Sequence, residues 1–214
     1  MHIALIGMSG TGKSYWSQCL GDAGFTRVGC DDLIGRRLAA ALGLSDTSLE
    51  AIGRWMGFPH EAGFHQRQAR YLDCERQVLQ DILDRLEKPR LSAHGDLVVD
   101  TTGSVVYTGA AFQRRLRQVA RVIYLTLNAT QRRRAQEAYL ARPRPVIWRD
   151  YYRRRPGETP DATLRRCYVA LLRDRHERYA NLAHQAVPVP DADCGPEARA
   201  AFLATIAPRC PHDS

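Results

Sequence analysis

Short apolar segments alternate with longer amphipathic ones along the whole chain. The apolar runs, each bounded by turn-forming residues, cover 2–6, 26–28, 97–99, 122–127 and 186–189. Helical periodicity covers 14–20, 33–42, 49–56, 66–86, 131–140, 162–182 and 197–206. Short buried strands separated by helices are typical of a parallel sheet covered on both faces. The pattern therefore predicts an α/β three-layer sandwich with a five-stranded parallel sheet and right-handed crossovers.

The turn after the first apolar run has the spacing GxxxxGK[ST] of a Walker A phosphate loop. In such a loop the glycines turn backbone N–H groups towards a phosphate, the lysine reaches the β- and γ-phosphates, and the hydroxyl holds Mg²⁺. The predicted strand, loop and helix follow in the required order, although a Gly-rich turn of chance composition is the alternative. We expect ATP and Mg²⁺ to bind at Gly7, Met8, Ser9, Gly10, Thr11, Gly12, Lys13, Ser14 and Tyr15.

Composition indicates one ordinary globular domain, which we place at 1–207 with a disordered tail at 208–214. The chain has 214 residues, of which 44% are hydrophobic and 25% charged. No apolar run approaches the roughly 18 residues that cross a bilayer, and we expect no signal peptide. The six cysteines are scattered without a CxxC pair, which favours reduced thiols over a zinc site or disulfides. We expect a cytoplasmic protein without a membrane partner.

The net charge of +8 is concentrated in arginine clusters at 114–117, 132–134 and 142–155. Such clusters can bind nucleic acid, close over a polyphosphate, or lie on solvated helix faces. No aromatic-interleaved basic motif accompanies them, so we do not expect nucleic acid as a partner. The sequence does not indicate an oligomeric state.

The segment 141–160 interrupts the helical periodicity and is rich in arginine, proline and aromatic residues. Between two helices of a nucleotide-binding fold, such a segment is typical of a mobile lid. The alternative is an irregular surface excursion whose aromatic side chains cover the edge of the core.

Two acidic positions follow predicted strands on the side of the sheet where ligands bind. Asp100 ends the run beside the phosphate-loop strand, where it would hold Mg²⁺ together with Ser14; a turn or capping aspartate is the alternative. Asp31 and Asp32 follow the second strand. One of the two can orient an acceptor hydroxyl or accept its proton. The position of Asp31 just before the helical run from Leu33 also suits an N-cap.

On these residues the chain resembles the shikimate kinase family of P-loop small-molecule kinases, over most of residues 2–190. The segment GCDDLI (29–34) is similar to the family's DxDxxI motif, with Asp31 in the place of a substrate-binding aspartate. The turn VDTTGS (99–104) is similar to the family's Gly-rich turn and keeps one glycine, Gly103. The resemblance implies that Asp31 and Gly103 bind the acceptor.

Two arginines of that family have counterparts further along the chain. The lid motif RPLL is approximated by RPVI from Arg144, which implies that Arg144 folds onto the nucleotide phosphates. The pattern RxxxYxxxA is met from Arg175 onwards, which implies that Arg175 holds an anionic group of the acceptor. The catalytic residues that the resemblance implies are Lys13, Asp31 and Arg144.

The chain also departs from the family at the acceptor side. Gly29 stands where the family has its first aspartate, and Leu72 stands where it has a substrate-binding arginine, three residues before Glu75. The resemblance thus implies phosphoryl transfer from ATP to a small hydroxylated, anionic acceptor and makes shikimate itself doubtful. Two alternatives stay open: an ATP-binding switch or ATPase without such an acceptor, and a kinase acting on nucleic-acid ends.

Overall fold

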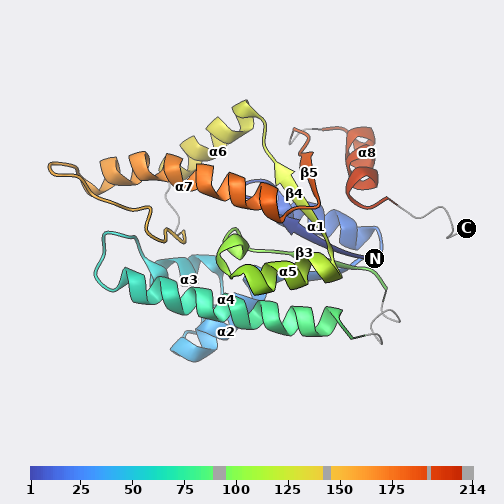
Figure 1. Cartoon of the computed structure of the whole chain (residues 1–214), viewed down its shortest axis with the longest axis horizontal. Helices are drawn as coiled ribbons and strands as arrows, with labels where there is room; N and C mark the ends of the chain where they lie inside the picture. The colour runs from blue at the N-terminus through green and yellow to red at the C-terminus, as the bar shows by residue number, and fades with distance from the viewer. Residues whose placement is uncertain (89–94, 142–145, 192–193, 209–214) are drawn as a thin grey trace, which may run out of the picture.

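The computed structural model describes residues 1–88, 95–141, 146–191 and 194–208 and is built on a five-stranded, all-parallel sheet (Figure 1). The strand order is β2-β3-β1-β4-β5, so the strand that leads into the phosphate loop lies in the middle. The strands are β1 (His2–Ile6), β2 (Thr26–Gly29), β3 (Leu97–Asp100), β4 (Arg121–Thr126) and β5 (Gln185–Pro188). The predicted α/β sandwich with a five-stranded parallel sheet is confirmed.

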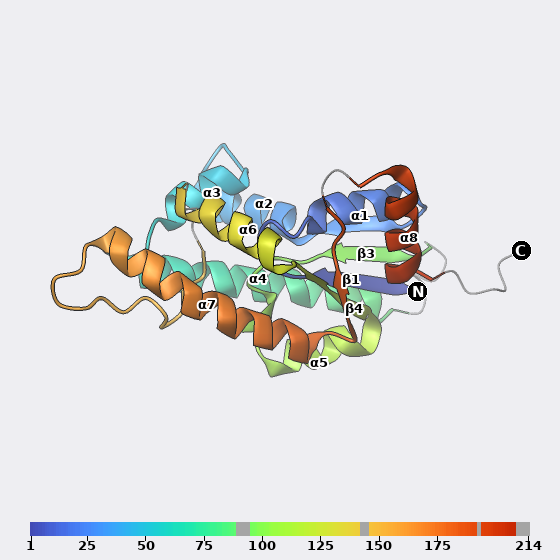
Figure 2. The same cartoon turned by 90° about the horizontal axis from the view of Figure 1, so that it is seen from above.

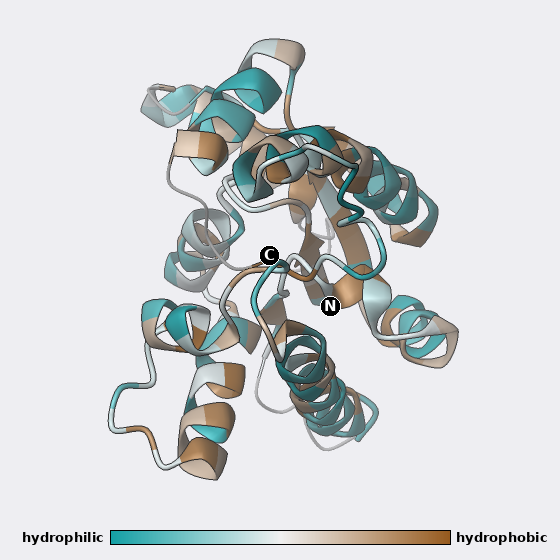
Figure 3. Cartoon of the chain, turned by 90° about the vertical axis from the view of Figure 1, so that its left-hand side faces the viewer, coloured by the Kyte–Doolittle hydropathy of each residue, from teal (hydrophilic) through white to brown (hydrophobic). Residues whose placement is uncertain are grey.

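Helices cover both faces of this sheet (Figures 1 and 2). They are α1 (Lys13–Asp22), α2 (Cys30–Leu42), α3 (Leu49–Met56), α4 (Phe64–Leu86), α5 (Ala110–Val119), α6 (Ala129–Ala141), α7 (Pro160–Leu182) and α8 (Pro196–Ile206), with a 3-10 turn η2 (Val105–Tyr107). Since side chains alternate along a strand, Ile3 and Leu5 pack under α1 and α8, whereas Ala4 and Ile6 pack with α2, α4 and α7. Figure 3 shows the resulting apolar interior and the hydrophilic outer sides of the helices.

Helix α5 is an element that the periodicity analysis did not predict. Its arginines obscure the short apolar series, of which Leu116 is fully buried. Arg115 forms ion pairs with Asp84 and Glu87 of the chain around α4, at 2.7 and 2.8 Å. Arg117 donates hydrogen bonds to two backbone carbonyls at the end of α7. Part of the first arginine cluster therefore connects α5 to neighbouring helices.

Helix α2 begins earlier than its apolar pattern indicated. Gly29 has extended backbone angles and is the N-cap, and the helix starts at Cys30, which is buried. The expectation that Asp31 caps the helix is therefore wrong. Asp31 and Asp32 lie in the first turn, where a carboxylate interacts favourably with the positive end of the helix dipole.

The described part of the segment between α6 and α7 is attached to the core around Trp148. Ile147 and Trp148 are buried, the latter completely. The side-chain oxygen of Gln68, on α4, accepts hydrogen bonds from the backbone N–H groups of Trp148 and Arg149, at 2.6 and 2.9 Å. Residues 153–157 are exposed. The segment therefore has both the buried aromatic contact expected of a surface excursion and the exposed arginines expected of a lid. Closure of this segment over a ligand stays a prediction.

Two sequence predictions fall outside the described residues: the lid arginine Arg144 and the disordered tail beyond Pro208. Among the helices that the structure does describe, none has the length and apolar character needed to cross a bilayer.

Candidate functional site

The phosphate loop joins the central strand to α1 and depends on glycine at two points. Gly7 has a φ of 152°, and a Cβ there would lie 3.0 Å from the backbone oxygen of Leu125. Gly12, at φ 78°, is the left-handed N-cap of α1. The hydroxyl of Thr11 donates to the carbonyl of Met8 at 2.9 Å and so helps to close the loop. Strand, loop and helix follow one another in the order predicted from the sequence.

Lys13 lies over this loop with its ammonium group turned inwards. It donates hydrogen bonds to the carbonyl oxygens of Gly7, at 3.0 Å, and Met8, at 3.1 Å. Burial lowers its pKa, while the nearby carboxylates of Asp100 and Asp31 act in the opposite direction. Within the described residues, the buried ammonium thus forms its hydrogen bonds to neutral oxygens of the loop, and an incoming anion would be a stronger partner.

The next two residues of the motif differ in their surroundings. Ser14 is exposed in the first turn of α1. Tyr15 is also exposed, and the Cζ atom of Arg199 in α8 lies 5.6 Å from the centroid of its ring. The Tyr15 side chain is therefore directed towards α8, and Ser14 is the one free to meet a ligand.

Asp100 is buried at the end of β3, level with Leu5 of β1. Its Oδ2 atom forms an ion pair with Arg27 of β2 at 3.0 Å and accepts a hydrogen bond from Ser17 of α1 at 3.4 Å. Arg27 also donates to the Ser17 hydroxyl, at 2.8 Å. The Oδ1 atom of Asp100 accepts no hydrogen bond from the described residues. One oxygen of this carboxylate is therefore bound within the protein, and the other is available to a ligand. The sequence analysis missed Arg27 and Ser17; the spacing of Ser17, one helical turn after Ser14, was a usable signal.

Asp31 lies in the same region as Lys13 and Asp100. Burial raises the pKa of Asp31 to about 6, and the Lys13 ammonium opposes that rise. A carboxyl group with this pKa is mainly ionised at neutral pH yet still basic enough to accept a proton.

The turn after β3 is held in place by Glu75, a buried residue of α4. The hydroxyls of Thr102 and Ser104 both donate to its carboxylate, the latter at 2.7 Å. Burial raises the pKa of Glu75 to about 7, and these two hydrogen bonds act against the rise. The sequence analysis used Glu75 only as a motif anchor and did not recognise this positioning role.

Gly103, at the centre of this turn, lies close to Arg175, another of the predicted acceptor residues. Its carbonyl accepts a hydrogen bond from the Tyr179 hydroxyl at 2.5 Å. A Cβ on Gly103 would lie 3.6 Å from Nη1 of Arg175 and 3.9 Å from the carbonyl oxygen of Gly7. The turn therefore lies between the phosphate loop and α7.

Arg175 is 6% exposed and has no ion-pair partner among the residues that the structure describes. One terminal nitrogen donates to the carbonyl of Ile147 at 2.8 Å, whereas Nε is buried without a hydrogen-bond partner. A buried guanidinium without an ion pair is poorly stabilised, and a ligand anion would provide a direct counter-charge.

The structure thus brings together the loop, Lys13, Asp31, Gly103 and Arg175 at the carboxyl ends of the strands, and places the Tyr15 ring elsewhere. In the described part of the chain, no group of three or more His, Cys, Asp or Glu side chains could together hold a metal ion. A cation at Ser14 and Asp100 would need further ligands from a bound phosphate or from water.

No protein-family model and no curated protein sequence matches the chain. Solved structures do match it. Shikimate kinase from Bacteroides thetaiotaomicron has a TM-score of 0.55 at 14% identity, covering 96% of this chain and 95% of that one. Shikimate kinase from Acinetobacter baumannii, in complex with shikimate, has a TM-score of 0.52 at 20% identity, covering 95% of this chain and 89% of that one.

Dephospho-CoA kinase from Campylobacter jejuni has a TM-score of 0.50 at 12% identity, with 96% of this chain and 94% of that one covered. Identities this low show likeness of fold. The order and direction of the strands, the phosphate loop after the central strand and the helices on both faces agree with this likeness. The chain therefore has the P-loop fold of the shikimate kinases.

Proposed function

We propose that this protein transfers the γ-phosphoryl group of ATP to a hydroxyl group of a small, anionic acceptor. The observation that carries the proposal is that Asp31 and Arg175 both lie within electrostatic range of Lys13, and that Arg175 is also next to Gly103. One region thus holds the buried ammonium of Lys13, a carboxyl group of raised pKa, and a guanidinium that has no ion-pair partner among the described residues. Phosphoryl transfer depends mainly on such positioning and charge neutralisation.

On the donor side, the loop amides and Lys13 would bind the β- and γ-phosphates. Lys13 would exchange the carbonyls of Gly7 and Met8 for phosphate oxygens, which are charged acceptors. The Ser14 hydroxyl and Oδ1 of Asp100 are oxygen ligands of the kind that Mg²⁺ prefers. When bound there, Mg²⁺ would neutralise charge on the phosphates.

On the acceptor side, Asp31 would orient the attacking hydroxyl and accept its proton, and Arg175 would bind an anionic group. Arg144, carried by the lid, would neutralise charge that develops during the transfer. Localisation in the cytoplasm agrees with this role and is part of the proposal.

An acceptor screen tests the proposal. ADP release is measured with ATP and Mg²⁺ against a panel of polyols and hydroxy acids that includes shikimate. We expect a large rise with at least one acceptor and a loss of more than about 100-fold in turnover for Lys13→Ala, because charge stabilisation in the transition state is removed. Lys88→Ala is the matched control, since Lys88 is the only other lysine and is exposed.

Two results would contradict the proposal. ATP consumption that does not respond to any acceptor would favour a switch or ATPase. Phosphorylation of oligonucleotide ends, with binding that falls steeply with salt, would favour a nucleic-acid-end kinase. Near-normal turnover of Lys13→Ala would remove the role given to that lysine.

A further inference from the structure

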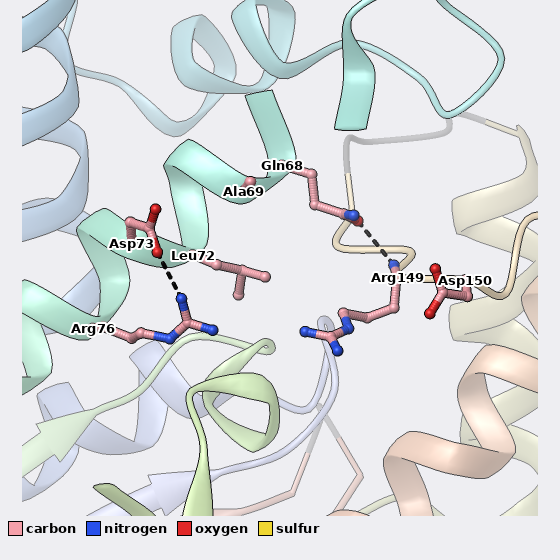
Figure 4. A pocket seen from close by; sticks show the side chains of 7 residues that line it. All are labelled: Gln68, Ala69, Leu72, Asp73, Arg76, Arg149 and Asp150. Atoms are coloured by element: carbon pink, nitrogen blue, oxygen red, sulfur yellow. Dashed lines mark hydrogen bonds and ion pairs between the residues drawn. The ribbon is translucent and has the colours of Figure 1, made fainter. Parts of the chain in front are cut away.

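A cavity of about 230 Å³ lies between α4 and the segment that follows residue 145 (Figure 4). Leu72 and Arg76 of α4 form one wall, and Arg149 forms the other. Figure 4 shows the two guanidinium groups extending towards each other across this space. Leu72 contributes no charge to its wall. The cationic groups of the lining are Arg76 and Arg149, and its acidic groups are Asp73 and Asp150.

The backbone at Arg149 is in an unusual conformation that directs its side chain into the cavity. Arg149 has a φ of 53° and is the one non-glycine residue with a positive φ in the described part of the chain. Left-handed backbone is disfavoured by about 1–2 kcal/mol for a residue with a Cβ. The two hydrogen bonds to Gln68 and the burial of Trp148 hold it there. Strain that the surroundings maintain in this way is found preferentially at functional sites.

The cationic groups of the cavity are only partly neutralised. Nη1 of Arg76 pairs with Asp73 at 2.6 Å and Nε donates to the carbonyl of Thr108, which leaves Nη2 uncommitted among the described residues. The Arg149 guanidinium has no ion pair within the described residues. Figure 4 shows the Asp150 carboxylate on the other side of the Arg149 backbone.

The cavity adjoins the acceptor region through a shared aromatic ring. The Cζ atom of Arg149 lies 5.8 Å from the centroid of the Tyr107 ring, and that of Arg175 lies 5.5 Å from the same centroid. The Tyr107 hydroxyl donates to Asp174 at 2.8 Å, which fixes the ring. A molecule held by Arg175 therefore has a second cationic site a short distance away.

We infer that Arg149, with Arg76, forms a second anion-binding subsite, so that the acceptor carries a second anionic group, a phosphate or a carboxylate, besides the one that Arg175 binds. This inference rests on the proposed kinase function. It defines the substrate class as a hydroxylated acid with two anionic groups.

Three linear six-carbon acids test the subsite. Gluconate has one anionic group, whereas glucarate adds a carboxylate and 6-phosphogluconate a phosphate at the other end. Each is titrated by calorimetry into protein loaded with Mg²⁺ and the non-hydrolysable ATP analogue AMP-PNP, so that the phosphate loop is filled. We expect at least one of the doubly anionic acids to bind about 10-fold more tightly than gluconate, as a charged hydrogen bond would produce. The better of the two identifies the second group.

Arg149→Gly removes the guanidinium while suiting the left-handed backbone, so the variant should unfold at a temperature at or above that of the wild type. It should bind all three acids within about twofold of one another. Arg178→Gln is the matched control: its Cζ lies 5.4 Å from the same Tyr107 centroid, yet its guanidinium is bound to Asp174 and does not line the cavity. The control should keep the preference.

The possible failures are distinguishable. Equal binding of the three acids, binding of none, or a preference that survives in Arg149→Gly overturns the second subsite and leaves nucleotide binding intact. Failure of AMP-PNP to bind overturns the proposed function. In that case the three acids are titrated into the proteins without nucleotide. The difference in preference between the wild type and the Arg149→Gly and Arg178→Gln variants then shows whether the second subsite exists.

Discussion

Replacement of Glu75 by glutamine should make the protein more stable at neutral and alkaline pH. Glu75 is 3% exposed between α4 and the turn after β3, and burial raises its pKa from 4.5 to about 7. Glutamine has nearly the same shape but no charge. The Thr102 and Ser104 hydroxyls can keep hydrogen bonds to it, since a hydroxyl both donates and accepts.

The magnitude follows from proton linkage. Between pH 4.5 and about 7 the folded protein keeps a proton on Glu75 that the unfolded chain has released. The free energy of unfolding therefore falls as the pH rises through this window, and the full loss is reached above the folded pKa. A pKa difference of this size corresponds to about 3 kcal/mol. Below pH 4.5 the group is neutral in both states and contributes no such loss.

Urea unfolding at a series of pH values from 4.5 to 8 measures this effect, with fluorescence of the buried Trp148 as the signal. The stability of Glu75→Gln relative to the wild type should rise by about 3 kcal/mol across the series. Comparison with the wild type largely removes the contribution of Asp31, which both proteins share. Glu177→Gln, at an exposed position on α7, is the matched control and should follow the wild type.

Parallel stability curves for the wild type and Glu75→Gln would refute the reasoning, because they would mean that folding does not change the ionisation of Glu75. A variant that shows the expected gain across the series but starts below the wild type at pH 4.5 would show in addition that the two hydroxyls need a carboxylate acceptor.

Two further predictions concern the carboxylates near Lys13. Burial raises the pKa of Asp31 to about 6, and the proposed role requires its ionised form, so kcat should rise as the pH passes 6. Asp31→Asn should remove this rise and lower kcat by about 100-fold or more. An unchanged pH–rate profile would exclude Asp31 as the base. Arg27→Gln leaves the buried Asp100 carboxylate without its ion pair, so urea unfolding should show that the free energy of unfolding falls by about 1–3 kcal/mol. Arg36→Gln, exposed on α2, is the control. Equal stability of the two variants would show that the pair does not stabilise the fold.

Local patterns were sufficient to predict most of the fold. Helix α3 has the bounds that its periodicity indicated, and the phosphate loop has the predicted place between β1 and α1. Helix α5 was missed because its arginines hide the apolar face, and their partners lie on α4 and α7, far away in the sequence. In the sequence, a helix face whose arginines form ion pairs with distant carboxylates looks the same as a helix face whose arginines are in contact with solvent.

The resemblance predicts that Asp31, Gly103 and Arg175 bind an acceptor, and that role stays a prediction. Only the fold brings the three residues close to the phosphate loop. The positive φ of Arg149 could not be predicted from the local sequence either. It depends on a hydrogen bond from the Arg149 N–H to Gln68, which is 81 residues away in the chain.

The sequence by itself determined the alternation of strands and helices and the phosphate loop, because both depend on side-chain periodicity and on backbone freedom within a few residues. The tertiary structure decided which charges are neutralised and which stay free. Asp100 is paired with Arg27, 73 residues away, whereas Arg175 and Arg149 have no ion-pair partner among the described residues. Pairing depends on which segments the fold places side by side, and that is a property of the packed chain as a whole.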